Sequence, residues 1–335
     1  MTAAPLRKDT FIMDNEVDPP ADAAAGADKV APATSARFLL PAGIKLPTAR
    51  GVFDDAWPAV AGVIGFIALW AILAPMVKTS LGTLPGPGDV WDAFGTLMDE
   101  YSAASADAAA AEAAGQSYTG PPTFIDQIFT SLKTVAMGFI LASLVAVPLG
   151  LVAGMSKRIN AAINPLVQVM RPVSPLAWLP IVTMVVSASM TGDDPMLAKS
   201  FVISAVVVML CSLWPTLINT AIGTASIDKD LINVGRVLKL GWFAKLTKLV
   251  LPSALPYIFT GMRLSLGTGW MVLIAAEMLA QNPGLGKFVW DEFQNGSEKS
   301  LARIMVAVVV IGLIGFMLDR LMMVLQSIAN RNHTV

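Results

Sequence analysis

Arg171 is the side chain with the clearest chemical potential in this sequence, because it stands inside a long apolar region in the stretch RPVSPLAWLP. The three prolines of that stretch remove backbone donors and interrupt helices. Irregular backbone survives at membrane depth only where protein buries it or where it lines a cavity. A guanidinium offers several donors in one plane, which suits an anion. The stretch therefore predicts a broken helix beside a substrate path, with Arg171 as an anion contact.

The same path has further candidates, which supply a hydroxyl, an indole ring or an accessible backbone. They are Ser174, Trp178, Gly267, Thr268 and Gly269. Each has a structural alternative: Arg171 can anchor the end of a short helix at the membrane interface, and Trp178 can serve in packing. Small residues in a membrane helix also let a neighbouring helix approach closely, so the glycine pair equally predicts a helix contact.

Three other ionisable residues fall in or near apolar runs, and such residues are functional candidates in a membrane. Lys133 stands near one end of its run, where a long side chain reaches the interface. For Arg263 we expect the same behaviour or a bond to a backbone carbonyl. Glu277 would repel an anion, so we assign it to structure or gating.

Several kinds of chemistry lack the residues that they need. The sequence has one cysteine, Cys211, and one histidine, His333, close to its last residue. A zinc site or a histidine-based catalytic centre is therefore not expected, and we predict no catalytic residue, metal or cofactor in this chain. The net charge of −1 gives no argument for a nucleic-acid partner.

The elements that position these residues are membrane spans. Of the 335 residues, 55% are hydrophobic and 14% are charged, whereas soluble domains carry about 25% charged residues. A spanning helix needs about 20 mostly apolar residues. Six runs meet this need: 56–77, 134–156, 163–190, 200–227, 257–279 and 301–325. The third contains RPVSPLAWLP and is fragmented by its prolines. The fold class is thus an all-α polytopic membrane protein.

Lysines and arginines gather in the segments that would face one side of the membrane. By the positive-inside rule, both termini are predicted to be cytoplasmic. We divide the chain into a disordered tail (1–55), a transmembrane domain (56–328) and a short C-terminal tail (329–335). An outer loop over 77–124 begins with a short amphipathic helix and continues as an alanine-rich insertion that we interpret as low complexity.

The cytoplasmic segment 225–256 is too polar to span and too regular for a linker. Its apolar residues recur at helical spacing, in two short helices that meet at Gly241, and Pro252 is expected to end the second. Basic residues occupy the polar side. An amphipathic pair of this kind lies on anionic lipid or docks a soluble partner.

This segment resembles the coupling-helix loop of ABC importer permeases. The family pattern is E-A-A, three residues, G, nine residues, I-x-L-P; here Asn233-Val234-Gly235 replace E-A-A, Lys239 replaces the glycine and Leu249 the isoleucine, while Leu251-Pro252 match. NVGRVLKLGW, LPSALPYIFTGMRLSLG, IAAEML and GLGKFVWD are similar to the nitrate, sulfonate and taurine type, and the first of these especially to its nitrate branch. RPVSPLAWLP and SLKTVAMGF…PLGLVAGMS also resemble that branch. The resemblance covers about residues 57–328.

The resemblance implies a type I importer permease fold and a set of partners. It implies a second permease copy, in a homodimer, two cytoplasmic ATPase subunits that bind ATP and magnesium, and a periplasmic binding protein, in a bacterial inner membrane. The chain has no GxxxxGK[ST] motif, so it is expected to be a transport subunit and not the ATPase. The candidates for the ATPase contact are Asp230, Asn233, Arg236, Lys239, Gly241 and Trp242.

The implied function is ATP-driven import of a small oxyanion, with nitrate or nitrite as the leading substrate. Bicarbonate, cyanate and sulfonate or taurine are the alternatives within the family. A secondary transporter and a non-transport scaffold are alternatives of other classes. The first is disfavoured because the sequence shows no inverted repeat, and the second because the third span is broken by prolines.

Overall fold

The computed structural model describes residues 49–79, 82–190 and 198–331. The chain divides into two units, Met1–Trp57 and Pro58–Val335, and the helical bundle belongs to the second. The elements are α1 (Ala49–Leu73), η1 (Ala74–Met76), β1 (Lys78–Thr79), β2 (Gly82–Thr83), α2 (Pro87–Ala113), α3 (Phe124–Met155), α4 (Lys157–Met170), α5 (Pro175–Ser189), α6 (Lys199–Ala225), α7 (Lys229–Val237), α8 (Trp242–Lys245), η2 (Leu246–Val250), α9 (Leu251–Ala280), α10 (Leu285–Asn295) and α11 (Glu298–Arg331). The predicted tail over 1–48 and the last residues, 332–335, lie outside the described residues. The remainder of that tail, 49–55, is the first part of α1.

The predicted spans are confirmed as helices, with one change of shape. Among the described residues, five helices are long and apolar enough to cross a membrane: Trp57–Met76, Phe124–Met155, Lys199–Ala225, Trp242–Ala280 and Lys299–Ala329. The third predicted span is instead the pair α4 and α5, bent by 101° at their junction. Pro175 begins α5 with Ser174 as its N-cap, because a proline fits the first turn of a helix and not its interior.

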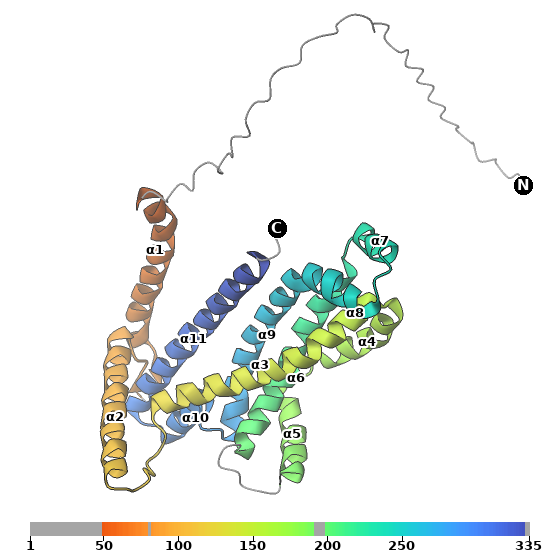
Figure 1. Ribbon diagram of the computed structural model, residues 1–335. Helices are drawn as coiled ribbons and strands as arrows, with labels where there is room; N and C mark the ends of the chain where they lie inside the picture. Colours follow the sequence, from red (N-terminus) through yellow and green to blue (C-terminus); the bar gives the residue numbers. More distant parts are fainter. Residues whose placement is uncertain (1–48, 80–81, 191–197, 332–335) are drawn as a thin grey trace, which may run out of the picture. The chain divides into compact units, whose positions relative to one another are not determined.

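The core of the bundle is formed by α3, α6 and α9, which lie side by side (Figure 1). Glycines make the approach of these helices possible. A Cβ at Gly138 of α3 would lie 2.7 Å from the carbonyl oxygen of Ala205, and one at Gly261 of α9 would lie 3.0 Å from that of Pro215. Both carbonyls belong to α6, so Gly138 and Gly261 are helix contacts, as small residues in membrane helices usually are.

A hydroxyl from α9 is inserted into the backbone ladder of α6. Pro215 lies inside α6 and cannot donate a hydrogen bond. One residue later, the Thr216 amide donates to Ser265 Oγ at 3.1 Å, and Ser265 Oγ donates to the Ser212 carbonyl at 2.5 Å. In a regular helix Thr216 N–H would bond directly to Ser212 C=O. Ser265 therefore joins the two spans at an opened turn, which is a known cause of helix bending.

The outer loop differs from its prediction in the length of its helix. The hairpin β1–β2 is antiparallel, with Lys78 opposite Thr83. The following helix, α2, runs to Ala113 and includes most of the alanine-rich insertion, so that part of this low-complexity sequence is helical and not an irregular loop. Alanine has the highest helix propensity of all residues, so the segment extends the predicted short helix instead of ending it.

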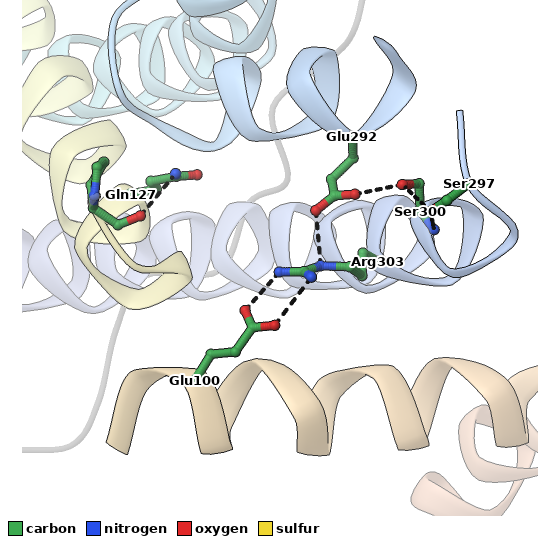
Figure 2. A network of polar contacts seen from close by, with 7 residues as sticks. Glu100, Gln127, Glu292, Ser297, Ser300 and Arg303 are labelled. Carbon is green, nitrogen blue, oxygen red and sulfur yellow. Dashed lines mark hydrogen bonds and ion pairs between the residues drawn. The ribbon is translucent and has the colours of Figure 1, made fainter. Parts of the chain in front are cut away.

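Arg303 connects three helices at the outer-loop end of the bundle (Figure 2). Its guanidinium donates two hydrogen bonds to Glu100 of α2, at 3.1 and 2.7 Å, and its Nε lies 2.9 Å from Glu292 Oε1 of α10. The other oxygen of Glu292 accepts from Ser300 at 2.7 Å. A bidentate arginine pair has a fixed geometry, so this network holds α2 and α10 against the start of α11.

Candidate functional site

The bend between α4 and α5 is the first part of the candidate site. Arg171 is the C-cap of α4, and its amide donates to the Val167 carbonyl at 2.9 Å. Its side chain is exposed, and among the described residues it makes no ion pair. Ser174 is also exposed, although its hydroxyl accepts from the Leu176 amide at 3.3 Å, and Trp178 is half-buried. The bend thus presents an uncompensated cation, while its role toward a substrate stays a prediction.

The three neighbouring candidates on α9, residues 267–269, differ in their exposure and in their contacts. Gly267 is exposed and a Cβ there would meet nothing within 4 Å, whereas Gly269 is buried and its Cβ would lie 2.5 Å from Ser212 Oγ of α6. Thr268 directs its hydroxyl to the carbonyl oxygens of Leu264 and Ser265, each at 3.0 Å. Gly269 is therefore occupied by a helix contact, and Gly267 is the member of the run whose backbone stays accessible.

This difference gives a matched pair of variants. Gly269→Ala is expected to lower the stability of the purified chain by about 1 kcal/mol or more, since the new methyl group enters a packed seam. Gly267→Ala is expected to preserve or raise stability, because alanine is favoured over glycine within helices. Thermal denaturation in detergent measures both. Equal melting temperatures for the two variants would contradict this assignment.

The segment 225–256 supplies the second part of the candidate site. All six residues predicted for the ATPase contact are exposed: Asp230, Asn233, Arg236, Lys239, Gly241 and Trp242. Apolar side chains lie exposed on the same short helices, with Val237 81% exposed, Phe243 71% and Trp242 60%. Isolated exposed apolar residues are ordinary, but a contiguous group of this kind marks an interaction surface.

Two details of this loop correct its predicted form. The left-handed residue at the end of α7 is Lys239, with φ +49, whereas Gly241 has an ordinary φ of −62 and N-caps α8. The Leu240 amide donates to the Gly235 carbonyl at 3.0 Å, which closes the end of α7. Lys239 thus occupies the position where the family pattern has glycine, and its left-handed backbone is one that glycine adopts without strain. Pro252 does not end the second helix, since it lies in the first turn of α9.

A small residue in α7 allows the loop to fold back on itself. Gly235 is buried, and a Cβ there would lie 2.7 Å from Leu249 Cδ1 of η2. These two residues are the third position of the E-A-A element and the position of the isoleucine in the family pattern. In this chain, the close approach of Gly235 and Leu249 brings α7 and η2 together.

Arg263 has a partner that sequence reasoning missed. It makes two hydrogen bonds to Asp319 of α11, at 2.5 and 2.9 Å, so the expectation of a lone arginine reaching the interface is corrected. An acidic residue inside an apolar run was the available signal. The pair lines a cavity of about 210 Å³ together with Gly267 and Trp270. With Asp319 bound to it, Arg263 is not a free anion contact.

Glu277 lies near the C-terminal end of α9 and is fully buried. Its carboxylate accepts hydrogen bonds from Ser131 Oγ at 2.7 Å, from the Gly286 amide at 3.1 Å and from Asn282 Nδ2 at 3.3 Å. The Ser131 hydroxyl oxygen also accepts from the Leu285 amide at 2.9 Å. Every partner is neutral, and together they join α3, α9 and α10. This geometry agrees with a structural role for Glu277.

Known families and proteins match the part of the chain that contains the segments described above. Residues 146–331 match the family model described as binding-protein-dependent transport system inner membrane component. The nitrate import permease protein NrtB of Synechococcus elongatus is 39% identical over 58% of this chain and 66% of its own length. The bicarbonate transport system permease protein CmpB of the same organism is 34% identical over 84% of this chain and 92% of its own length.

Similarity to solved structures concerns the fold alone. The inward-facing MetNI methionine ABC transporter aligns with a TM-score of 0.50 at 11% sequence identity, over 62% of this chain and 95% of that chain. This confirms the predicted type I permease architecture. The family model covers more than half of the 335 residues. The chain therefore belongs to the family of binding-protein-dependent transport system inner membrane components, the ABC importer permeases, within their nitrate and bicarbonate branch.

Proposed function

We propose that this chain is the membrane permease subunit of an ATP-driven importer that carries nitrate or nitrite across a bacterial inner membrane. The observation that carries the substrate is the 39% identity to a nitrate import permease. The exposed guanidinium of Arg171 at the α4–α5 bend supports an anion as cargo, since a planar group of donors suits a planar oxyanion.

The proposed complex contains two copies of this chain, two ATPase subunits and a periplasmic binding protein that delivers the anion. ATP and magnesium bind to the ATPase subunits. Each ATPase subunit receives the exposed apolar group of α7 and α8, and its nucleotide-driven movement rocks the spans. Both termini are cytoplasmic in this arrangement, as the distribution of lysine and arginine predicts.

Bicarbonate is the second candidate substrate. It is favoured by the similarity to CmpB, which extends over 92% of that protein. Both anions are small and planar, so the same cation would serve either. Cyanate, sulfonate or taurine transport and a secondary transporter follow in order of support.

Reconstituted uptake distinguishes these candidates. The chain is co-purified with its ATPase and binding-protein partners, placed in liposomes and supplied with ATP and labelled anions. Nitrate uptake that requires ATP and is not matched by bicarbonate is the expected result. Preferential bicarbonate uptake would move the assignment to the second candidate. Uptake by this chain alone, without ATPase subunits, would contradict an ABC importer.

The predicted role of Arg171 is tested in the same assay. Arg171→Ala is expected to lower nitrate uptake at least about tenfold, because a hydrogen bond to a charged group contributes about 1.5–3 kcal/mol. Arg158→Ala, an exposed arginine near the other end of α4, is the control and should keep uptake. If Arg171→Ala transports every tested anion normally, Arg171 is an interfacial anchor and not a substrate contact.

A further inference from the structure

A charged cavity lies at the point where α11 enters the membrane. It has a volume of about 380 Å³ and is lined by residues of β2, α2 and α11, including Thr83, Asp89, Asp92, Lys299 and Arg303. The apolar run of α11 begins at Lys299, so the cavity is at the level of the membrane interface. Four of these side chains are charged. The two acids, Asp89 and Asp92, belong to α2, and the two bases, Lys299 and Arg303, belong to α11.

One of these charges is paired with opposite charges within the chain, one accepts a backbone hydrogen bond, and two have neither kind of partner in the part of the chain that the structure describes. Arg303 is bound by Glu100 and Glu292, and Asp89 accepts a hydrogen bond from the Gly86 amide at 2.8 Å (Figure 2 for Arg303). Asp92 and Lys299 make no ion pair among the described residues. The cavity therefore offers one free carboxylate and one free ammonium group at its wall.

A separate apolar groove lies further along α11 and is also lined by α2. Its volume is about 240 Å³, and its walls include Trp70 of α1, Val90 and Trp91 of α2, and Val309 and Leu313 of α11. Trp91 is 74% exposed and Leu313 57%. By helix rise, Leu313 lies about 15 Å from Arg303, which is about half the thickness of the hydrocarbon core of a bilayer.

We propose that the cavity and the groove together bind one zwitterionic phospholipid, of the phosphatidylethanolamine class. The phosphate lies against Lys299 and the Thr83 hydroxyl. The primary ammonium group donates to Asp92 and Asp89, and an acyl chain occupies the groove between α1, α2 and α11. The order of polar cavity and apolar groove along α11 is the order of head group and tail in a lipid.

The chemistry of the cavity selects among head groups. A choline head group cannot donate hydrogen bonds to a carboxylate and is normally recognised by aromatic rings, and the described residues that line the cavity include no aromatic ring. An anionic head group such as phosphatidylglycerol would meet the carboxylates of Asp89 and Asp92. A primary ammonium group can donate hydrogen bonds to both acids of the cavity, and it is small enough to enter it.

The test is native mass spectrometry of the delipidated full-length chain titrated with dioleoyl phosphatidylethanolamine, phosphatidylcholine or phosphatidylglycerol. Phosphatidylethanolamine is expected to bind at least about tenfold more tightly than the other two, since charge-assisted hydrogen bonds are the strong ones. Asp92→Asn and Lys299→Gln should each weaken it about tenfold. Asp107→Asn, an exposed acid on α2 outside the cavity, is the control and should bind as the original chain.

A second pair of variants tests the groove. Val309→Trp fills it and should prevent phosphatidylethanolamine binding, whereas Val308→Trp places the same ring at a neighbouring residue that does not line the groove. Equal affinity for the three lipids, or binding that is insensitive to Asp92→Asn and Lys299→Gln, overturns the proposal. It is also overturned if these variants lose association with a periplasmic binding protein while lipid binding is unchanged, because the cavity would then dock a protein.

Discussion

A chain that carries Trp242→Ala is expected to insert into the membrane normally and to lose its ATPase subunits. Trp242 is 60% exposed at the first position of α8, beside Phe243 and near Val237, which are also exposed. A large aromatic at the centre of an interface commonly contributes about 2 kcal/mol or more, which corresponds to about thirtyfold in affinity. Co-purification of the ATPase subunits measures the loss, and ATP-dependent uptake should fall with it.

The chain offers a matched control for this experiment. Trp91 has a similar exposure, 74%, but lies on α2 in the outer loop. Trp91→Ala should keep the ATPase subunits. Gly241→Asp is an independent probe of the same surface, because a side chain at Gly241 meets nothing within 4 Å and the residue has an ordinary φ. If both Trp242→Ala and Gly241→Asp retain ATPase association, the assignment of α7 and α8 as the docking element is wrong.

Glu277→Ala is expected to cause the largest loss of stability of any variant considered for this chain. The substitution leaves three buried donors, from Ser131, Asn282 and Gly286, without their acceptor. Each unsatisfied buried donor costs about 1–3 kcal/mol, so the total is about 3 kcal/mol or more. The melting temperature of the chain in detergent should fall clearly, and the amount of folded protein in the membrane should fall as well.

Glu277→Gln and Glu112→Ala complete this test. Glutamine keeps one acceptor oxygen but turns an amide group toward donors, so its stability should lie between those of the original chain and Glu277→Ala. Glu112 lies on α2, away from this cluster, and its removal should change little. An unchanged melting temperature for Glu277→Ala would show that water satisfies the donors and that the cluster does not hold α3, α9 and α10 together.

The positions of the membrane spans could be predicted from the sequence, but the contacts between the spans could not. Long, mostly apolar runs located five helices, and the prolines at 172 and 175 marked the break in the third predicted span, because chain length and hydropathy are local properties. The angle of 101° at that break was not predictable, since it depends on packing against α6 and α9. The length of α2 was underestimated because alanine-rich sequence is consistent with both a helix and a loop insertion.

Polar contacts within the bundle were the least predictable part of the candidate site. Arg263 and Asp319 are 56 residues apart, and Ser131 and Glu277 are 146 apart. No local pattern indicates which acid will meet which donor over such separations. By contrast, the exposure of the six residues of the coupling loop followed from their amphipathic spacing, which is local. The substrate role of Arg171 still rests on residue chemistry and awaits the uptake assay.

The continuity of the helix from α8 into α9 has a mechanical consequence. Trp242 to Ala280 forms one continuous run of helix, of 39 residues, with a π-helical turn at Leu246–Val250. At helical rise this run is roughly 58 Å long. In the proposed complex it is a stiff lever with Trp242 at one end and Glu277 near the other. A tilt imposed on its cytoplasmic end is transmitted as torque to the opposite end, and the π-helical turn is the point where the lever can yield.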